Sequence, residues 1–243
     1  YRLPFPNDIR RNADGSIDMQ GHPEPGPLFG IDVVRDMLDS IENDLDGFAL
    51  NSPIVFRLTD LPNTASICLD EGVEYPTPAE GESFCAAGAE AEASVYLVNV
   101  EQGDSDYNQR VPIEISLGST RAQYLCQNSI GLIPTAGTFL KPNTTYAAVI
   151  TSDLKDSRAN TPIRDQDFAK VMQGSASGLS DHVIQATEPL LTWAADKLSD
   201  AQRDAIVAAT VFTAGDPGRQ SKGLRDAVHA ATPPPVFGEA FNC

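Results

Sequence analysis

The segment Leu140–Thr151, "LKPNTTYAAVIT", decides the fold of this chain because it joins a turn to a strand. Pro142 and Asn143 are turn-forming residues, and the run that follows is rich in the β-branched and aromatic residues that favour strands. Leu140, Pro142 and Tyr146 have the spacing of a tyrosine corner. In such a corner the tyrosine hydroxyl bonds back to the chain just upstream and fixes the crossing between two packed sheets. We therefore assign these three residues structural roles.

Runs of the same kind occur on the N-terminal side of this segment. They are "SPIVFRL", "ASVYLVNV", "RVPIEISL" and "AQYLCQNSIGLIP", and clusters of Gly, Pro, Asn and Asp separate them. Short β-rich runs with such punctuation are typical of an antiparallel sandwich. The next segment, "SDLKDSRANTPI", resembles the closing turn of bacterial immunoglobulin-like repeats, with Lys155, Asp156 and Asn160 at the corresponding positions. The sequence thus predicts a mainly β protein with an immunoglobulin-like antiparallel β-sandwich, in which Asp156 and Asn160 hydrogen-bond within their own turn.

Helical patterns flank and interrupt the predicted sandwich. Residues 1–50 form an extended arm with a small hairpin at Asp14–Gly15 and an amphipathic helix that ends near Gly47. Residues 51–216 form the sandwich, with a helical insertion at about 165–204. Residues 217–243 form a helix and a Pro-rich linker that points to a possible downstream domain.

The predicted insertion ends in a strand that returns to the sheet. It contains a helix pair in which Pro189 begins the second helix, and a capping box of Ser199 and Gln202. The returning buried strand spans Ile206–Thr213. We expect Trp193 and Phe212 to pack in the core, with an exposed partner surface as the alternative place for Trp193.

The charge of the chain restricts its partners. The 243 residues carry 17 basic and 34 acidic side chains, which gives a formal net charge of -17. Such an excess of acid works against binding of nucleic acid or of an anionic membrane. No apolar run reaches the length of about 20 residues that a transmembrane helix needs. No signal peptide is visible, so for an exported protein "YRLPFPND" is a mature or trimmed start, with any signal or lipid anchor upstream.

The four cysteines suit an oxidising compartment. They have no C-x-x-C pair and no histidine at zinc-ligand spacing, which argues against a structural metal site. An even number of cysteines in an acidic chain is typical of proteins in such a compartment, and four cysteines can form two disulfide bridges in three different pairings. We favour the bridge Cys68–Cys85, which closes a polar loop, and the bridge Cys126–Cys243.

Groups suited to catalysis or cofactor binding are few. The only histidines are His22, His182 and His229, and each is expected to be a surface residue. "GSASG" places Ala176 where a nucleophile elbow has its serine. Alternating oxygen ligands at residues 12–18 have the pattern of a calcium loop, but the downstream glutamate is missing and a plain turn is favoured. We predict no catalytic residue, no cofactor-binding residue and no metal ligand in this chain. The alternative to the last of these is that the chain binds a calcium ion.

Five motifs together resemble a known family. "PFPNDIRRNADGSIDM", "LDGFALNSPIVFRL", "VYLVNV", "LIPTAGTFLKPNTTYAAVITSDLKD" and "AATVFTAGDP" are similar, in this order, to the N-terminal region of secreted or surface-anchored bacterial lipase-like proteins. These are the bacterial virulence factor lipases and their myxobacterial extracellular relatives. In that family an immunoglobulin-like region precedes an α/β-hydrolase domain that carries the catalytic residues, and none of those residues has a counterpart here.

The resemblance implies a function and a location. The chain would be a non-catalytic accessory module of a secreted or surface-anchored bacterial lipase or esterase. A lipoprotein is one form that such surface anchoring takes. The partner of the module would be a downstream hydrolase domain or another surface protein. The alternative is an adhesion or self-assembly module without a hydrolase, in which edge strands or the acidic face bind a partner. A small enzyme that uses an unrecognised carboxylate pair is the third hypothesis.

Overall fold

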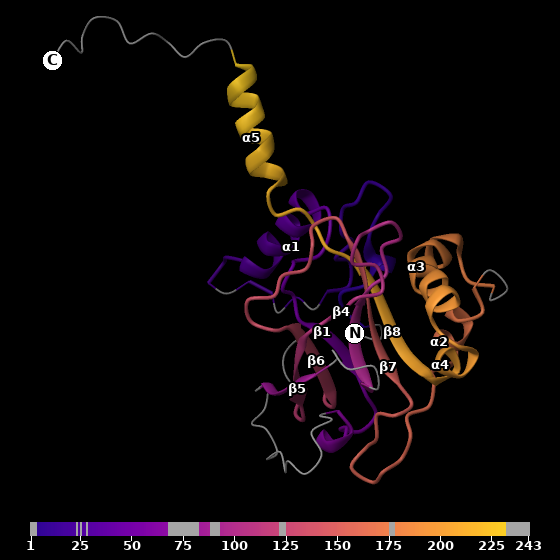
Figure 1. Cartoon of the computed structure of the whole chain (residues 1–243). Coiled ribbons are helices and arrows are strands. Elements are labelled where there is room, and N and C mark those ends of the chain that lie inside the picture. The colour runs from indigo at the N-terminus through magenta and orange to yellow at the C-terminus, as the bar shows by residue number, and fades with distance from the viewer. Residues whose placement is uncertain are drawn as a thin grey trace, which may run out of the picture.

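Two antiparallel four-stranded sheets form the centre of the molecule (Figure 1). The structure is a computed structural model, and it describes residues 4–22, 24, 26–27, 29–67, 83–87, 93–121, 125–174 and 178–231. Among the described residues, helices hold about 31% and strands about 24%, so this part of the chain is mixed α/β. The expectation of a mainly β protein is therefore right for the central layers only. The arm, the insertion and the C-terminal segment contribute more helix than the short strands contribute sheet.

The first sheet has the strand order β1–β6–β5–β2. Its strands are β1 (Ile54–Arg57), β2 (Ser83–Ala87), β5 (Ile113–Gly118) and β6 (Ser129–Pro134). Strand β5 alternates strictly between buried and half-buried residues, because one face covers the core and the other faces outward.

The second sheet has the strand order β4–β3–β7–β8. Its strands are β3 (Val95–Asn99), β4 (Arg110–Val111), β7 (Thr145–Thr151) and β8 (Ile206–Thr213). All seven residues of β7 are buried, so this strand is covered on both faces. Continuous burial explains why "TYAAVIT" lacks the apolar and polar alternation of a half-exposed strand.

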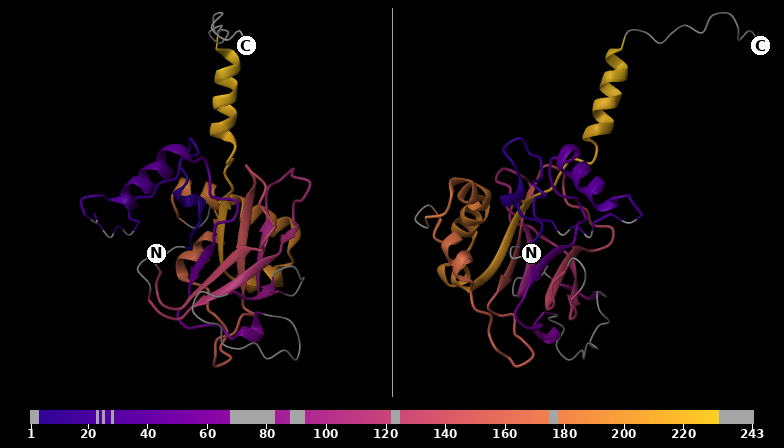
Figure 2. Two further views of the ribbon diagram at one scale, coloured as in Figure 1. Left: turned by 90° about the vertical axis from the view of Figure 1, so that its left-hand side faces the viewer. Right: turned by 180° about the vertical axis from the view of Figure 1, so that it is seen from behind.

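Two hydrophobic cores cover the two faces of the second sheet. The first core lies between the sheets and includes Phe212, which is 1% exposed. The second lies beneath the helical insertion and includes Trp193, whose Nε1 donates to Asn108 Oδ1 at 2.8 Å. Both residues expected in the core are thus buried, and the alternative of an exposed surface for Trp193 is wrong. The result is a sandwich with a third, helical layer outside the second sheet (Figure 2).

In the part of the insertion that the structure describes, three helices lie between β7 and β8. They are α2 (Gln166–Val171), α3 (Asp181–Lys197) and α4 (Asp200–Ala205). The predicted capping box is present at the start of α4, where Ser199 and Gln202 bond each other's backbone. Asp156 accepts hydrogen bonds from the N–H groups of Arg158 and Asn160, as predicted for the turn after β7.

The predicted break at Pro189 is wrong. Pro189 lies inside the single helix α3, whose buried side includes Thr187, Leu190 and Trp193 on both sides of the proline. Packing of this side on the second sheet holds the helix together although Pro189 cannot donate a backbone hydrogen bond. Tertiary contacts therefore override the local helix-breaking signal.

The N-terminal arm wraps the sandwich and leads into α1 (Val33–Asp44). Its short helix η1 (Asp8–Arg10) precedes a hairpin in which Arg11 and Ile17 pair. Ile17 from the arm and Leu38 from α1 reach the inter-sheet core. A second short helix, η2 (Thr64–Ser66), follows β1, and α5 (Arg219–Ala230) projects away from the body of the molecule (Figure 1).

The turn before β7 has the hydrogen bond that defines a tyrosine corner. Tyr146 is 3% exposed, and its hydroxyl accepts a hydrogen bond from the backbone N–H of Lys141 at 2.9 Å. Leu140 is buried beside it in the inter-sheet core. The side chain of Tyr146 thus ties the start of β7 to the preceding turn.

Replacing Tyr146 by phenylalanine should lower the free energy of unfolding by about 1–2 kcal/mol. The variant lacks the hydroxyl that accepts the hydrogen bond from the Lys141 N–H, so this half-buried donor loses its partner. Chemical denaturation measures this difference. Tyr96→Phe is the matched control, because no hydrogen bond of the Tyr96 hydroxyl is found in the part of the chain that the structure describes. Equal effects of the two changes would contradict a special role for Tyr146.

Candidate functional site

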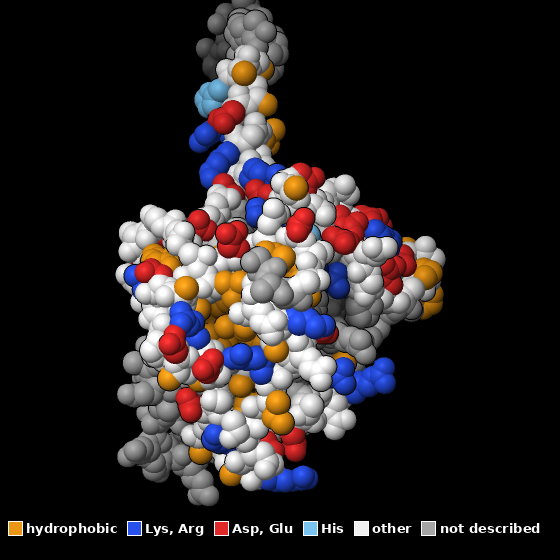
Figure 3. Space-filling view, turned by 90° about the vertical axis from the view of Figure 1, so that its right-hand side faces the viewer, with side chains coloured by type: hydrophobic (Ala, Val, Ile, Leu, Met, Phe, Trp, Pro, Cys, Tyr) orange, Lys and Arg blue, Asp and Glu red, His pale blue; other side chains and the backbone are white. Residues whose placement is uncertain are grey.

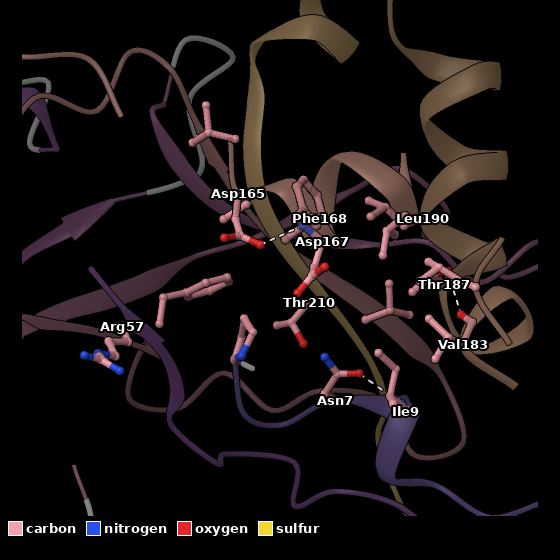
Figure 4. A pocket seen from close by; sticks show the side chains of 18 residues that line it. Asn7, Ile9, Arg57, Asp165, Asp167, Phe168, Val183, Thr187, Leu190 and Thr210 are labelled. Atoms are coloured by element: carbon pink, nitrogen blue, oxygen red, sulfur yellow. Dashed lines mark hydrogen bonds between the residues drawn. The ribbon is translucent and has the colours of Figure 1, made fainter. Parts of the chain in front are cut away.

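The sandwich has a pocket along one side, where β1 and β8 form edges of the two sheets. We call it the β8 groove, and its volume is about 610 Å³ (Figure 4). The arm, both edge strands and the insertion contribute side chains to it. The lining residues are Pro4, Asn7, Ile9, Phe56, Arg57, Asp165, Asp167, Phe168, Val171, Leu179, Val183, Thr187, Leu190 and Val207–Val211.

Local hydrogen bonds hold the walls of the β8 groove in place. Asn7 begins η1, and its Oδ1 accepts from the N–H of Ile9 at 2.9 Å. The start of α3 is attached to the same short helix, since His182 Nε2 lies 2.7 Å from the carbonyl oxygen of Ile9. Asp165 caps α2 by accepting from the N–H of Asp167 at 2.8 Å. The arm and the insertion, far apart in sequence, thereby enclose the edge of β8.

The chemistry of the β8 groove suits binding. Most of its lining is aliphatic or aromatic, and the lining residues include no Ser, Cys, His or Lys. Polar side chains come from Asn7, Arg57, Asp165, Asp167, Thr187 and Thr210. Figure 4 shows Asp167, Thr210 and Asn7 one after another across the pocket. An apolar cavity with a few polar groups is the usual form of a ligand site. Its lining supplies no nucleophile with a neighbouring general base.

One end of the β8 edge is closed by the half-buried carboxylate of Asp8. Asp8 accepts hydrogen bonds from the backbone N–H of Thr213 at 2.9 Å and from the Thr213 hydroxyl at 2.6 Å. Burial raises the pKa of Asp8 above its ordinary value of 3.8, although the bonds from Thr213 oppose this shift. The folded protein therefore holds the Asp8 proton more tightly than the unfolded chain does.

This pKa shift predicts a pH-dependent difference between the wild type and Asp8→Asn. The contribution of Asp8 to stability should be largest below pH 3.8 and should decrease as the pH rises through the raised pKa. The free energy of unfolding of the wild type minus that of the variant should thus fall between pH 3 and pH 7. Urea denaturation over this range measures it, and a difference that grows with pH would contradict the assignment.

The residues assigned from sequence lie elsewhere. Tyr146 and Leu140 hold the corner before β7, and none of the assigned structural residues lines the β8 groove. Cys126 is a half-buried free cysteine, so the expected bridge from Cys126 to Cys243 is not present in the structure. Cys68 lies outside the described residues, as does the side chain of Cys85, so the bridge Cys68–Cys85 stays a prediction. Sequence reasoning missed the groove because no single motif carries it.

A second surface of interest is the projecting helix α5, together with α1. Leu224 and Val228 of α5 are 69% and 65% exposed, and Figure 3 shows apolar and charged side chains on different sides of this helix. On α1, Val33 and Met37 are each 59% exposed. Helix α5 has three basic residues and one acidic residue, whereas α1 has one basic and four acidic residues. Each helix therefore has an exposed apolar stripe, and the charged residues of α1 are mainly acidic whereas those of α5 are mainly basic.

Comparisons with protein-family models, with curated proteins and with solved structures find no match to this chain. Within the described residues, no helix is long and apolar enough to cross a membrane. No group of three or more His, Cys, Asp or Glu side chains in that part of the chain is arranged to hold a metal ion.

Proposed function

We propose that this chain is a non-catalytic extracellular module that assists a secreted or surface-anchored bacterial hydrolase of the lipase and esterase type. The observation that carries the proposal is α5, all of whose residues are exposed although Leu224 and Val228 form an apolar stripe. A helix in this state suits packing on another domain. The similarity of the five sequence motifs to the N-terminal region of lipase-like proteins supports a hydrolase as that domain.

An immunoglobulin-like topology is the finer fold that we assign to the sandwich. The order β1–β6–β5 corresponds to strands B, E and D, and the order β4–β3–β7–β8 to strands C′, C, F and G. The bridge between Phe5 and Val55 then stands for strand A. The position of Tyr146 near the start of β7 supports the assignment, because the tyrosine corner of such domains lies near the start of strand F. Strand β2, next to β5, is an addition to this order.

The test of the non-catalytic role is turnover of chromogenic esters by the chain of 243 residues. We expect no turnover above that of buffer, because the proposal places the reaction in another domain. Turnover that disappears on substitution of Asp165 or Asp167, the two carboxylates in the lining of the β8 groove, would instead make this chain an enzyme.

A second candidate function is self-assembly at a cell surface. It rests on the exposed apolar residues of α1 and α5 and on the opposite charges of the residues around them. Helix α5 of one copy could therefore pack on α1 of another copy with complementary charges. Molar mass in solution measures it. Self-assembly predicts a particle larger than 26.0 kDa that Leu224→Asp reduces to a monomer, whereas Gln220→Asp, also on α5, has little effect. A wild-type monomer at high concentration would contradict this candidate.

A further inference from the structure

From the geometry of β8 we infer that the β8 groove binds an extended segment of a partner protein, which adds to the second sheet as a new strand. The inference does not depend on whether the partner is a hydrolase. It commits to a segment with apolar side chains and a basic residue near one end. The argument rests on the direction of backbone groups, on the shape of the groove and on its charge.

The first step is that β8 is an edge strand whose free edge faces the groove. Its neighbour in the sheet is β7, and among the described residues no other named strand pairs with it. Thr213 shows which residues face away from β7, because its N–H donates to Asp8 and its carbonyl accepts from the N–H of Phe48 at 2.9 Å. In an antiparallel pair this direction repeats at every second residue.

Val211 and Ala209 therefore also direct their N–H and C=O groups away from β7. In the described part of the chain, no hydrogen bond reaches these groups from the groove side. Both residues line the groove, and both are at most 8% exposed. Since buried backbone groups are almost always paired, a free edge in this position is suited to a strand that supplies the missing partners.

The second step is the length and lining of the open edge. Asp8 and Phe48 occupy the end at Thr213, and Arg164 Nε donates to the carbonyl oxygen of Ile206 at the other end. Between these ends the five residues that line the groove are Val207–Val211, and they extend over about 15 Å at the usual rise of a strand. Phe168, Val183 and Phe56 surround them with apolar surface. A partner segment of about five residues would bury apolar side chains there.

The third step is charge. Asp165 and Asp167 line the groove on the side of α2; the side chain of Asp167 is 84% exposed and pairs with Lys170 of the same helix at 3.3 Å, a surface contact that a cation of the partner can replace. The only basic residue in the lining is Arg57, on the side of β1. With a formal net charge of -17 for the whole chain, a lysine or arginine of the partner next to Asp167 is the complementary choice. The two sides of the groove would then set the direction of the added strand.

The test uses the full chain and a synthetic probe. The probe is an eight-residue peptide of alternating valine and threonine with a lysine at one end, and its control is the same peptide with alternate backbone nitrogens methylated. Without peptide, the amide protons of Ala209 and Val211 should exchange with solvent faster than those of Thr210 and Phe212. With the probe, Ala209 and Val211 should become protected, and the methylated peptide should bind at least tenfold more weakly.

Two variants separate the groove from the general charge of the protein. Asp167→Lys should weaken binding of the lysine peptide and strengthen binding of a glutamate peptide, whereas Asp226→Lys on α5 makes the same charge change and should alter neither. Several results would overturn the inference: no binding at millimolar peptide, equal binding of the methylated peptide, or protection of Ala209 and Val211 before any peptide is added. The last result would mean that this chain or a second copy already fills the edge.

Discussion

Replacing Phe212 by alanine should lower the free energy of unfolding by about 3–5 kcal/mol, which is the usual loss for a fully buried phenylalanine. Phe212 is 1% exposed in the core between the sheets. Its ring stacks on Tyr146 at 6.2 Å between centroids and meets Phe48 edge-on at 6.3 Å. The change thus opens a cavity where β7, β8 and the arm meet.

Guanidinium denaturation followed by fluorescence measures this loss, because Trp193 is the only tryptophan and lies in the second core. Phe139→Ala is the matched control, since Phe139 is 68% exposed and its removal should change stability by less than about 0.5 kcal/mol. If the Phe212 variant were as stable as the Phe139 variant, the packing of β8 against β7 and the arm would be wrong.

Gly47→Ala is the second change for which we expect a large loss, about 2–5 kcal/mol. A Cβ atom at residue 47 would lie 2.6 Å from the N atom of Gly215 and 2.8 Å from the carbonyl oxygen of Thr213. These are backbone atoms, so the chain itself must move. The movement would weaken the hydrogen bonds between Phe48 and β8 and between Gly215 and Phe48, in addition to the strain of overpacking.

Gly223→Ala is the control for this prediction, because the same atom added at residue 223 of α5 meets nothing within 4 Å. Alanine also has the higher helix propensity, so this variant should be as stable as the wild type or slightly more stable. Thermal unfolding of the two variants side by side measures the contrast. A Gly47 variant with an unchanged melting temperature would contradict the close approach of the arm to β8.

Features fixed by short stretches of sequence were predictable. The turn before Tyr146 and the capping box at Ser199 need only a few adjacent residues, and both have the hydrogen bonds that their motifs imply. The returning strand was predicted as Ile206–Thr213, and β8 has these bounds. A run of buried β-branched residues between Gln202 and Gly215 leaves few other structures for that segment.

Features that depend on distant segments were not predictable. Pro189 is a helix-breaking signal when it is considered alone, but the buried side of α3 carries the helix through it. The β8 groove needs the arm, β1, α2, α3 and β8 together, and its polar groups at Asn7 and Thr210 are separated by some two hundred positions. A pattern within one segment carries no information about such a meeting of segments. The amphipathic pattern of α1 was visible in the sequence, but the exposure of Val33 and Met37 on α1 and of Leu224 and Val228 on α5 was not.

The central claim, that this chain is a non-catalytic module of a larger hydrolase, is tested most directly by intact mass and peptide mapping of the natural protein without reduction. The account predicts that the polypeptide continues past residue 243 into a segment with a G-x-S-x-G nucleophile elbow. The same peptide map shows which of Cys68, Cys85, Cys126 and Cys243 form disulfide bridges. A natural protein whose last residue is Cys243 would contradict the claim and would leave binding or self-assembly as the function.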